Sequence, residues 1–217
     1  MAEDPSAIDS IRTSYDRVAD AYAEAIFDEL KEKPFDREQL ARFAAATAGG
    51  RVCDMGCGPG QVARFLREAG ADVFGLDLSP GMIAEARRLN PGIEFREGDM
   101  LALPLEDGSL AGIAAFYAIV NLPPEVRPRA FAEMARALGP GGRLLLTFHI
   151  GGESLGVKEL WGRPITMNFY LLDPGVIRRE LEETGFAIEE HLEREPYSPK
   201  VEHQSRRAYL FARKPEE

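Results

Sequence analysis

Short apolar segments alternate with amphipathic segments from residue 51 onward. Short apolar runs predict buried β-strands, and apolar residues that recur at three- and four-residue steps predict helices. Strands that alternate with helices through short connections predict a parallel sheet with helices on both faces. The predicted strands cover residues 51–55, 72–77, 93–97, 110–117 and 143–149, and the helices between them cover residues 61–69, 80–89 and 124–138.

The first fifty residues precede this alternation and are predicted to be helical. A second helix is expected over residues 35–47, because two glycines follow it and glycine commonly ends a helix. The first helix is indicated by one apolar stripe at helical spacing, which consists of Ile11, Tyr15, Val18, Tyr22 and Ile26.

After residue 150 the pattern changes. Residues 157–161 and 164–170 predict two short strands, which indicates an inserted hairpin. Residues 193–204 show no helical pattern, so the strands on either side of them are expected to pair antiparallel. The remaining predicted elements are a helix over residues 173–184 and strands over residues 186–192 and 205–214. The chain is therefore predicted to be an α/β protein with a doubly wound, mostly parallel seven-stranded sheet and a reversed last strand.

Composition and charge narrow the function classes. The chain has 217 residues, of which 45% are hydrophobic and 29% are charged, as in a soluble globular domain. Its net charge of −10 argues against a nucleic-acid partner. No apolar run approaches the ~20 residues of a membrane span, and the first residues are too acidic for a secretory signal. We expect a cytoplasmic protein, either a monomer or a homodimer, that binds neither nucleic acid nor membrane.

A glycine-rich loop follows the strand predicted at residues 51–55. Asp54 is followed by Gly56, Gly58 and Gly60, and glycine permits a sharp turn and a close approach of a ligand to the backbone. Asp77 ends the next predicted strand, and an acid at that place can accept hydrogen bonds from two ribose hydroxyls. The spacing predicts a nucleoside-binding site.

These motifs resemble those of the class I S-adenosylmethionine-dependent methyltransferases, and the resemblance covers nearly the whole chain. Residues 54–60 resemble the family's acid-x-Gly-x-Gly-x-Gly loop, and Asp77 its ribose-binding acid. Gly98, Asp99 and Met100 are similar to the family's adenine-binding segment, residues 138–146 to its turn into strand five, and residues 208–214 to its reversed seventh strand. The resemblance implies S-adenosylmethionine as cofactor, with S-adenosylhomocysteine as product.

The resemblance also implies which residues bind this cofactor. Ser14, Tyr15 and Asp16 match a segment that lies over the cofactor in many relatives, and Tyr117 follows the fourth strand near the expected position of the methyl group. With two cysteines, no structural zinc site is expected. The implied cofactor-binding residues are Asp54, Gly56, Cys57, Gly58, Gly60, Asp77, Leu78, Asp99, Met100, Tyr117 and Tyr15.

A nicotinamide dinucleotide dehydrogenase is the main alternative for the glycine loop alone. Its Gly-x-Gly-x-x-Gly spacing differs from this chain, where Gly60 comes one residue earlier and Pro59 precedes it. The reversed last strand also disfavours a dehydrogenase.

The methyl acceptor is expected at the carboxyl edge of the sheet, where ligands bind in open α/β folds. His149 ends the fifth predicted strand and is a candidate acid–base or orienting residue, although a histidine that only caps the strand end is an equal alternative. Tyr15 is the second catalytic candidate. The predicted substrate pocket consists of Tyr22, Asn121, His149, Trp161, Phe169 and Tyr197.

We therefore predict one methyltransferase domain over residues 1–217. It comprises a helical lid (1–50), a cofactor-binding core (51–150), an inserted cap (151–172), and a last helix with a C-terminal hairpin (173–217). The expected reaction is methyl transfer to a small molecule by in-line displacement, mainly through positioning. The alternatives are a tRNA or rRNA methyltransferase and a non-catalytic cofactor-binding module.

Overall fold

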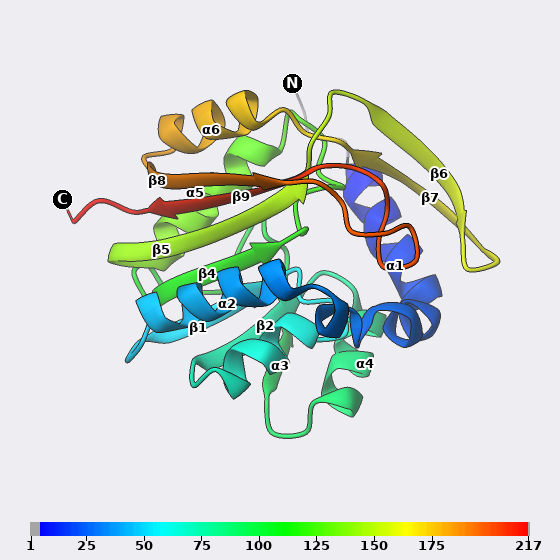
Figure 1. The fold of residues 1–217 in the computed structure, drawn as a ribbon, viewed down its shortest axis with the longest axis horizontal. Coiled ribbons are helices and arrows are strands. Elements are labelled where there is room, and N and C mark those ends of the chain that lie inside the picture. Colours follow the sequence, from blue (N-terminus) through cyan, green and yellow to red (C-terminus); the bar gives the residue numbers. More distant parts are fainter. Residues whose placement is uncertain (1–4, 217) are drawn as a thin grey trace.

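The computed structural model describes residues 5–216, and these residues form one seven-stranded sheet with a separate hairpin (Figure 1). The strand order in the sheet is β3-β2-β1-β4-β5-β9-β8. Its strands are β1 (Arg51–Met55), β2 (Asp72–Asp77), β3 (Glu94–Glu97), β4 (Leu110–Phe116), β5 (Leu138–His149), β8 (Ala187–Arg194) and β9 (Arg207–Arg213). Only β9 runs antiparallel to its neighbours β5 and β8 within this described sheet. The predicted mostly parallel sheet with a reversed last strand is confirmed.

Helices cover both faces of this sheet, as the alternation of strands and helices predicts. Two of them, α5 (Arg127–Ala137) and α6 (Pro174–Glu183), pack on one face, and three, α2 (Pro34–Ala46), α3 (Gln61–Glu68) and α4 (Pro80–Leu89), pack on the other. Figure 1 shows α6 and α2 on opposite sides of the sheet. The short 3₁₀ helix η1 (Glu29–Glu32) leads into α2.

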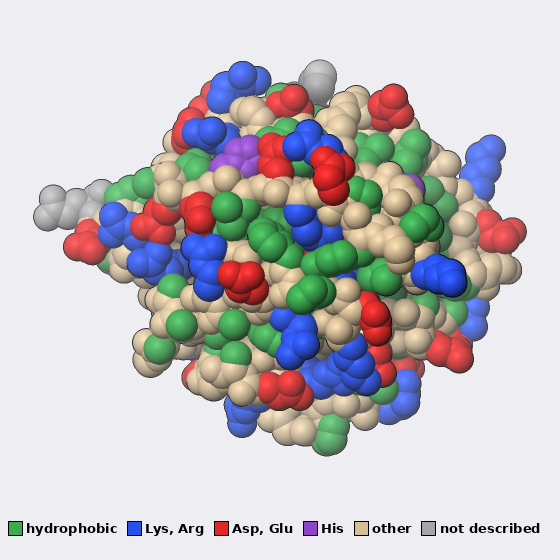
Figure 2. Space-filling view, viewed as in Figure 1, with side chains coloured by type: hydrophobic (Ala, Val, Ile, Leu, Met, Phe, Trp, Pro, Cys, Tyr) green, Lys and Arg blue, Asp and Glu red, His purple; other side chains and the backbone are tan. Residues whose placement is uncertain are grey.

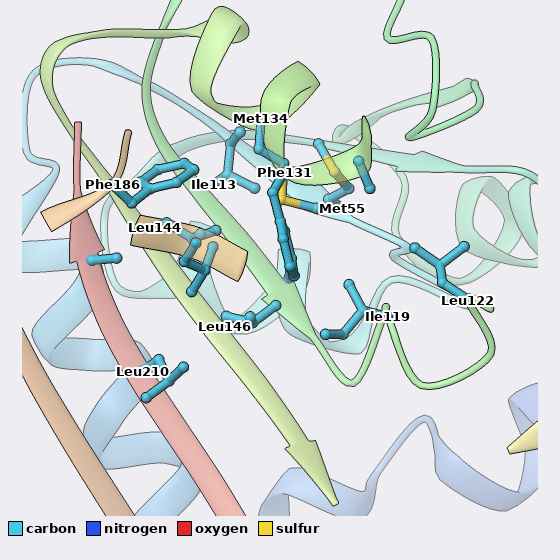
Figure 3. Close-up of a cluster of buried hydrophobic side chains, with 14 of the residues drawn as sticks. Met55, Ile113, Ile119, Leu122, Phe131, Met134, Leu144, Leu146, Phe186 and Leu210 are labelled. Carbon is cyan, nitrogen blue, oxygen red and sulfur yellow. The ribbon is translucent and has the colours of Figure 1, made fainter. Parts of the chain in front are cut away.

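Alternate strand residues point to opposite faces and build two apolar layers. On the α5 side, Met55, Ile113 and Leu144 pack with Phe131 of α5 and Phe186 (Figure 3). All five side chains are buried. The layer on the other face joins strands β1, β2, β4 and β5 to helices α2, α3 and α4. These layers hold the carboxyl ends of the parallel strands in a fixed arrangement.

The first long helix, α1 (Pro5–Ile26), lies beside the carboxyl end of the sheet and carries the inserted hairpin on its side (Figure 1). The hairpin consists of β6 (Ser154–Leu160) and β7 (Arg163–Tyr170), which pair antiparallel. Ser14 Oγ accepts a 3.0 Å hydrogen bond from the backbone N–H of Thr166 in β7. Asp16 Oδ1 accepts hydrogen bonds from Ser79 Oγ at 2.5 Å and Gly81 N at 2.9 Å. Helix α1 is therefore tied both to the hairpin and to the start of α4.

Several element boundaries differ from the sequence prediction, and three of these differences have a clear structural reason. Strand β5 begins at Leu138 because Leu138 pairs with Leu110 before a register shift restores the regular ladder. Helix α5 begins at Arg127, because residues 117–126 form a series of bends and turns, in which Val126 N donates to Pro123 O. Strand β4 ends at Phe116, since Tyr117 adopts a φ of +58° that is incompatible with a strand.

The surface carries charges of both signs. Acidic and basic side chains are interspersed on the face drawn in Figure 2. Within residues 5–216, every helix is too short or too polar to cross a membrane.

Candidate functional site

A cavity lies at the carboxyl ends of β1, β2 and β4, beside helix α1. Parallel strands of an α/β sheet bring the loops that follow them to one edge, which is where such folds bind ligands. The walls come from α1 (Ile8, Ile11, Tyr15, Tyr22), the glycine loop (Gly56, Cys57, Gly58), the end of β2 (Asp77, Leu78), the turn after β3 (Asp99, Met100), the segment after β4 (Phe116, Tyr117, Ala118, Asn121, Leu122), and Glu29, Gln61 and Met82.

The glycine loop forms the floor of this cavity. Gly56, Gly58 and Gly60 have φ angles of +67°, +51° and +84°, which glycine adopts without the steric cost that a Cβ carries. A Cβ on Gly56 would lie 2.7 Å from the Cβ of Ala118, and one on Gly60 would lie 2.7 Å from the ring of Phe95. Gly56 and Gly58 line the cavity, whereas Gly60 lies outside its walls and packs closely against Phe95.

Asp77 holds the glycine loop and presents its carboxylate to the cavity. Its Oδ2 accepts a 2.9 Å hydrogen bond from Gly58 N, and its Oδ1 accepts one of 2.9 Å from Ser79 N. A carboxylate has about four acceptor positions, so two remain for hydroxyl groups of a ligand. Burial raises the pKa of Asp77, and the hydrogen bonds from Ser79 and Gly58 oppose that shift.

Asp54 lies beneath the loop and is absent from the cavity walls. Its Oδ2 accepts a 2.8 Å hydrogen bond from Ala63 N and so fixes the start of α3. Burial raises the pKa of Asp54 to about 8, because a charged carboxylate is disfavoured away from water. The resemblance implies a cofactor-binding role for Asp54. In the structure Asp54 does not line the cavity, and the hydrogen bond that it accepts from Ala63 N holds the glycine loop against α3.

This shift of Asp54 predicts a pH-dependent stability. The folded state keeps the proton up to about pH 8 while the unfolded chain releases it near 3.8, so the stabilising contribution of Asp54 falls as the pH rises between these values. The variant Asp54→Asn lacks this titration. We expect the free energy of unfolding of the wild type, minus that of the variant, to decrease from about pH 5 to about pH 8 in urea titrations. A difference that is constant over this range would contradict the assignment.

The turn after β3 supplies Asp99 and Met100 to the cavity walls. Asp99 Oδ1 accepts a 2.8 Å hydrogen bond from Leu101 N, which fixes the turn. The second carboxylate oxygen of Asp99 remains as an acceptor. The adenine-binding segment predicted from the sequence is thus at one end of the cavity.

Helix α1 is joined to the segment after β4 by a hydrogen bond across the cavity. Tyr15 Oη donates to Asn121 Oδ1 at 2.7 Å, and Asn121 Nδ2 donates to Asn168 O of β7 at 2.8 Å. The ring of Tyr22 stands edge-on to Tyr15, with centroids 5.8 Å apart. Burial raises the pKa of Tyr15, so its hydroxyl stays protonated and acts as a donor.

His149 lies behind Tyr117 and outside the cavity walls. The two ring centroids are 5.0 Å apart, and His149 Nδ1 lies 2.8 Å from Ser205 Oγ. Burial, followed by the charge of Arg207, lowers the pKa of His149 to about 3. The imidazole is therefore neutral at physiological pH and a weak base. A catalytic role for His149 stays a prediction.

Of the predicted substrate-pocket residues, Tyr22 and Asn121 line the cavity, and the three other aromatic residues do not. Trp161 lies at the turn of the hairpin, is 47% exposed and touches Tyr22 edge-on at 5.4 Å. Phe169 packs with the apolar side chains between α1 and β7. Tyr197 Oη accepts a 2.9 Å hydrogen bond from Phe35 N. The hairpin thus packs against the outer side of α1, which keeps Trp161 away from the cavity.

Five charged side chains form a buried network on the other side of Tyr117. Glu202, whose side chain is 2% exposed, accepts hydrogen bonds from Arg194 Nη2 at 3.0 Å and Tyr197 N at 2.6 Å. The other members of the network are Asp36, Lys33 and Arg207. Tyr117 Oη lies 3.5 Å from Asp36 Oδ1. This network backs the wall of the cavity that Tyr117 forms.

Glu29 and Gln61 line the cavity although the sequence did not indicate them. Gln61 directly follows the third glycine, so its position was a usable signal. Glu29 belongs to a short 3₁₀ helix without a periodic pattern, and only the fold brings it to the glycine loop.

Comparison with known proteins agrees with this geometry. Residues 52–142 match the family model described as a methyltransferase domain. The chain is 33% identical over 154 residues to a malonyl-[acyl-carrier protein] O-methyltransferase of Pectobacterium atrosepticum, which covers 71% of this chain and 58% of the relative. It is 38% identical over 101 residues to a demethylmenaquinone methyltransferase of Beutenbergia cavernae, which covers 46% of this chain and 41% of the relative. The chain thus spans about half the length of these curated relatives.

A solved structure has the same fold. An S-adenosylmethionine-dependent methyltransferase of Mesorhizobium loti superimposes with a TM-score of 0.64 and 25% identity, over 81% of this chain and 96% of that chain. Residues 52–142 thus match a methyltransferase domain, and the glycine loop, Asp77 and the reversed strand agree with the fold and motifs of the class I S-adenosylmethionine-dependent methyltransferases. The match to a methyltransferase domain and this S-adenosylmethionine-dependent neighbour support S-adenosylmethionine as the cofactor.

Proposed function

We propose that this chain transfers the methyl group of S-adenosylmethionine to a small-molecule acceptor. The observation that carries this proposal is the charge of the cavity walls. The charged residues that line the cavity are Glu29, Asp77 and Asp99, and all three are acidic. A partly enclosed acidic cavity favours a cationic ligand, and the sulfonium group of S-adenosylmethionine is a cation.

The residues present fit this cofactor from end to end. Asp99 follows β3, Asp77 ends β2 and the glycine loop follows β1, and these strands are neighbours in the sheet. Asp99 and Met100 would hold the adenine, the free acceptor positions of Asp77 would hold the ribose hydroxyls, and the glycine loop would support the amino-acid end. When bound, the cofactor supplies a methyl group that is already activated by its sulfonium.

The chain's own contribution is positioning and exclusion of water. Tyr117 and Asn121 lie in the segment after β4, and Tyr15 of α1 donates a hydrogen bond to Asn121 across the cavity. An acceptor held among these side chains would be aligned for in-line displacement, for which correct placement supplies most of the rate. The raised pKa of Tyr15 keeps its phenol protonated, and the lowered pKa of His149 makes its neutral imidazole a weak base. Neither side chain is therefore suited to remove a proton from an acceptor at neutral pH. The proposed mechanism therefore suits an acceptor that needs no early loss of a proton.

The names of the relatives support a small acceptor, since one acts on demethylmenaquinone and one on a malonyl group carried by a protein. Incubation with methyl-labelled S-adenosylmethionine and a fractionated pool of small metabolites tests the proposal. We expect label in a small molecule and none in added tRNA or rRNA. Labelled RNA would favour the nucleic-acid alternative, and cofactor binding without any labelled product would favour the non-catalytic one.

A further inference from the structure

We propose that Glu29 and Gln61 bind the α-ammonium group at the amino-acid end of the cofactor. This inference rests on the proposed function, because it names the partner of two cavity residues within the same site. Both side chains line the cavity beside Gly58 and Tyr22. They come from parts of the chain outside the glycine loop itself, the 3₁₀ helix η1 and the first position of α3.

The order of the strands places the amino-acid end near these residues. The turn after β3 carries Asp99, β2 ends at Asp77, and the loop after β1 carries Gly58. A nucleoside held by Asp99 and Asp77 therefore extends across β1, away from β3. Gln61 follows this loop directly, and its Nε2 lies 3.2 Å from Glu29 Oε1. The two side chains thus meet where the far end of the ligand comes to lie.

An unpartnered acceptor marks this corner as a binding position for a donor. Gln61 is 8% exposed, and its Oε1 is buried without a hydrogen-bond partner among the described residues. Buried polar atoms of folded proteins are nearly always paired. The amide orientation follows from its neighbour, since Gln61 Nε2 donates to the Glu29 carboxylate and the reverse orientation would place two acceptors together. Gln61 Oε1 can therefore accept a hydrogen bond from a donor group of the ligand.

The negative charge of Glu29 favours the ammonium group of the ligand's amino-acid end over its carboxylate group. Glu29 Oε2 pairs with Lys33 Nζ at 2.6 Å, and Glu29 Oε1 faces Gln61 and the cavity. Lys33 is 3.7 Å from Glu202 as well, so it is shared between two acids. A ligand carboxylate would meet Glu29 with like charge, whereas an ammonium would complete the hydrogen bonding of both Glu29 and Gln61.

Three ligands and two variants test this inference by calorimetry. The ligands are S-adenosylhomocysteine, its analogue in which hydrogen replaces the α-amino group, and 5′-methylthioadenosine, which lacks the amino-acid end. The variants are Glu29→Gln and Gln61→Leu, and Glu32→Gln is the matched control, because Glu32 is exposed on the same 3₁₀ helix. Thermal unfolding of each variant confirms that it is folded.

We expect Glu29→Gln and Gln61→Leu each to weaken binding of S-adenosylhomocysteine about tenfold, as for a lost hydrogen bond to a charged group. Neither variant should change the affinity for the desamino analogue or for 5′-methylthioadenosine, and Glu32→Gln should match the wild type with every ligand. Equal losses for all three ligands, or no loss for any, would overturn this assignment while the cofactor site stands. A folded wild type that binds none of the ligands would instead overturn the proposed function.

Discussion

Replacement of Asp77 by alanine is expected to weaken binding of S-adenosylhomocysteine about 100-fold, because two hydrogen bonds that the ribose hydroxyls donate to the charged carboxylate are lost. The same carboxylate accepts hydrogen bonds from Gly58 N and Ser79 N at 2.9 Å. Its removal also loosens the glycine loop, which adds to the loss. Calorimetric titration of the folded variant gives the change in affinity directly.

Asp72→Ala is the matched control for this substitution. Asp72 begins the same strand that Asp77 ends, and it is exposed. The control should bind the cofactor product like the wild type. If Asp77→Ala retains wild-type affinity while its thermal unfolding is unchanged, Asp77 does not hold the ribose and the orientation of the ligand in the cavity is wrong.

The second large effect is expected on stability, from Glu202→Gln. The Glu202 carboxylate lies 3.4 Å from Arg207 Nη2 and 3.7 Å from Lys33 Nζ, in addition to its hydrogen bonds with Arg194. Neutralising it leaves buried positive charge uncompensated, and breaking a buried ion pair in this way costs about 3–5 kcal/mol. Urea unfolding at neutral pH measures the loss.

The pH dependence identifies the carboxylate charge as the cause. Burial opposes ionisation of Glu202, but the hydrogen bonds from Arg194 and Tyr197 outweigh it and lower the pKa to about 2, from an ordinary value of 4.5. The stabilisation is therefore complete above pH 4.5 and is lost as the pH falls toward 2. The stability gap between wild type and variant should shrink over this range.

Glu195→Gln serves as the control for the network. Glu195 lies in the same C-terminal loop, is exposed, and pairs only with Arg206 among the described residues. An exposed ion pair contributes about 0–1 kcal/mol, so this control should unfold nearly like the wild type. A Glu202→Gln variant that is as stable as Glu195→Gln at neutral pH would show that the network does not stabilise the fold.

The arrangement of the sheet could be predicted because its signals are local. The helix predicted over residues 80–89 is an example, since serine favours the position before a helix and proline its first position, and Ser79 Oγ accepts a hydrogen bond from Met82 N at the start of α4. Alternating short strands and helices require a parallel sheet, and the unpatterned segment before β9 indicated its reversal. The start of β5 at Leu138 could not be predicted, because it depends on a register shift against β4.

The places of the glycine loop, Asp77 and Asp99 in the cavity walls were also predictable, since each lies at or just after the end of a strand. Asp77 and Asp99 occupy adjacent strand ends in the sheet, so their position in the chain fixes their position in space. Glu29 lies far from Gln61 in the sequence, and Lys33 lies far from Glu202, so each of these pairs meets only through tertiary packing. The direction of the inserted hairpin was likewise undetermined, which is why Trp161 was expected in the cavity and lies outside it.

Calorimetric titration of the wild-type protein with S-adenosylmethionine tests the central claim most directly. One saturable site per chain is predicted, with binding that also raises the thermal unfolding temperature, because a ligand of the folded state stabilises it. A folded protein that shows neither heat of binding nor thermal stabilisation at saturating cofactor would contradict the assignment of the cavity.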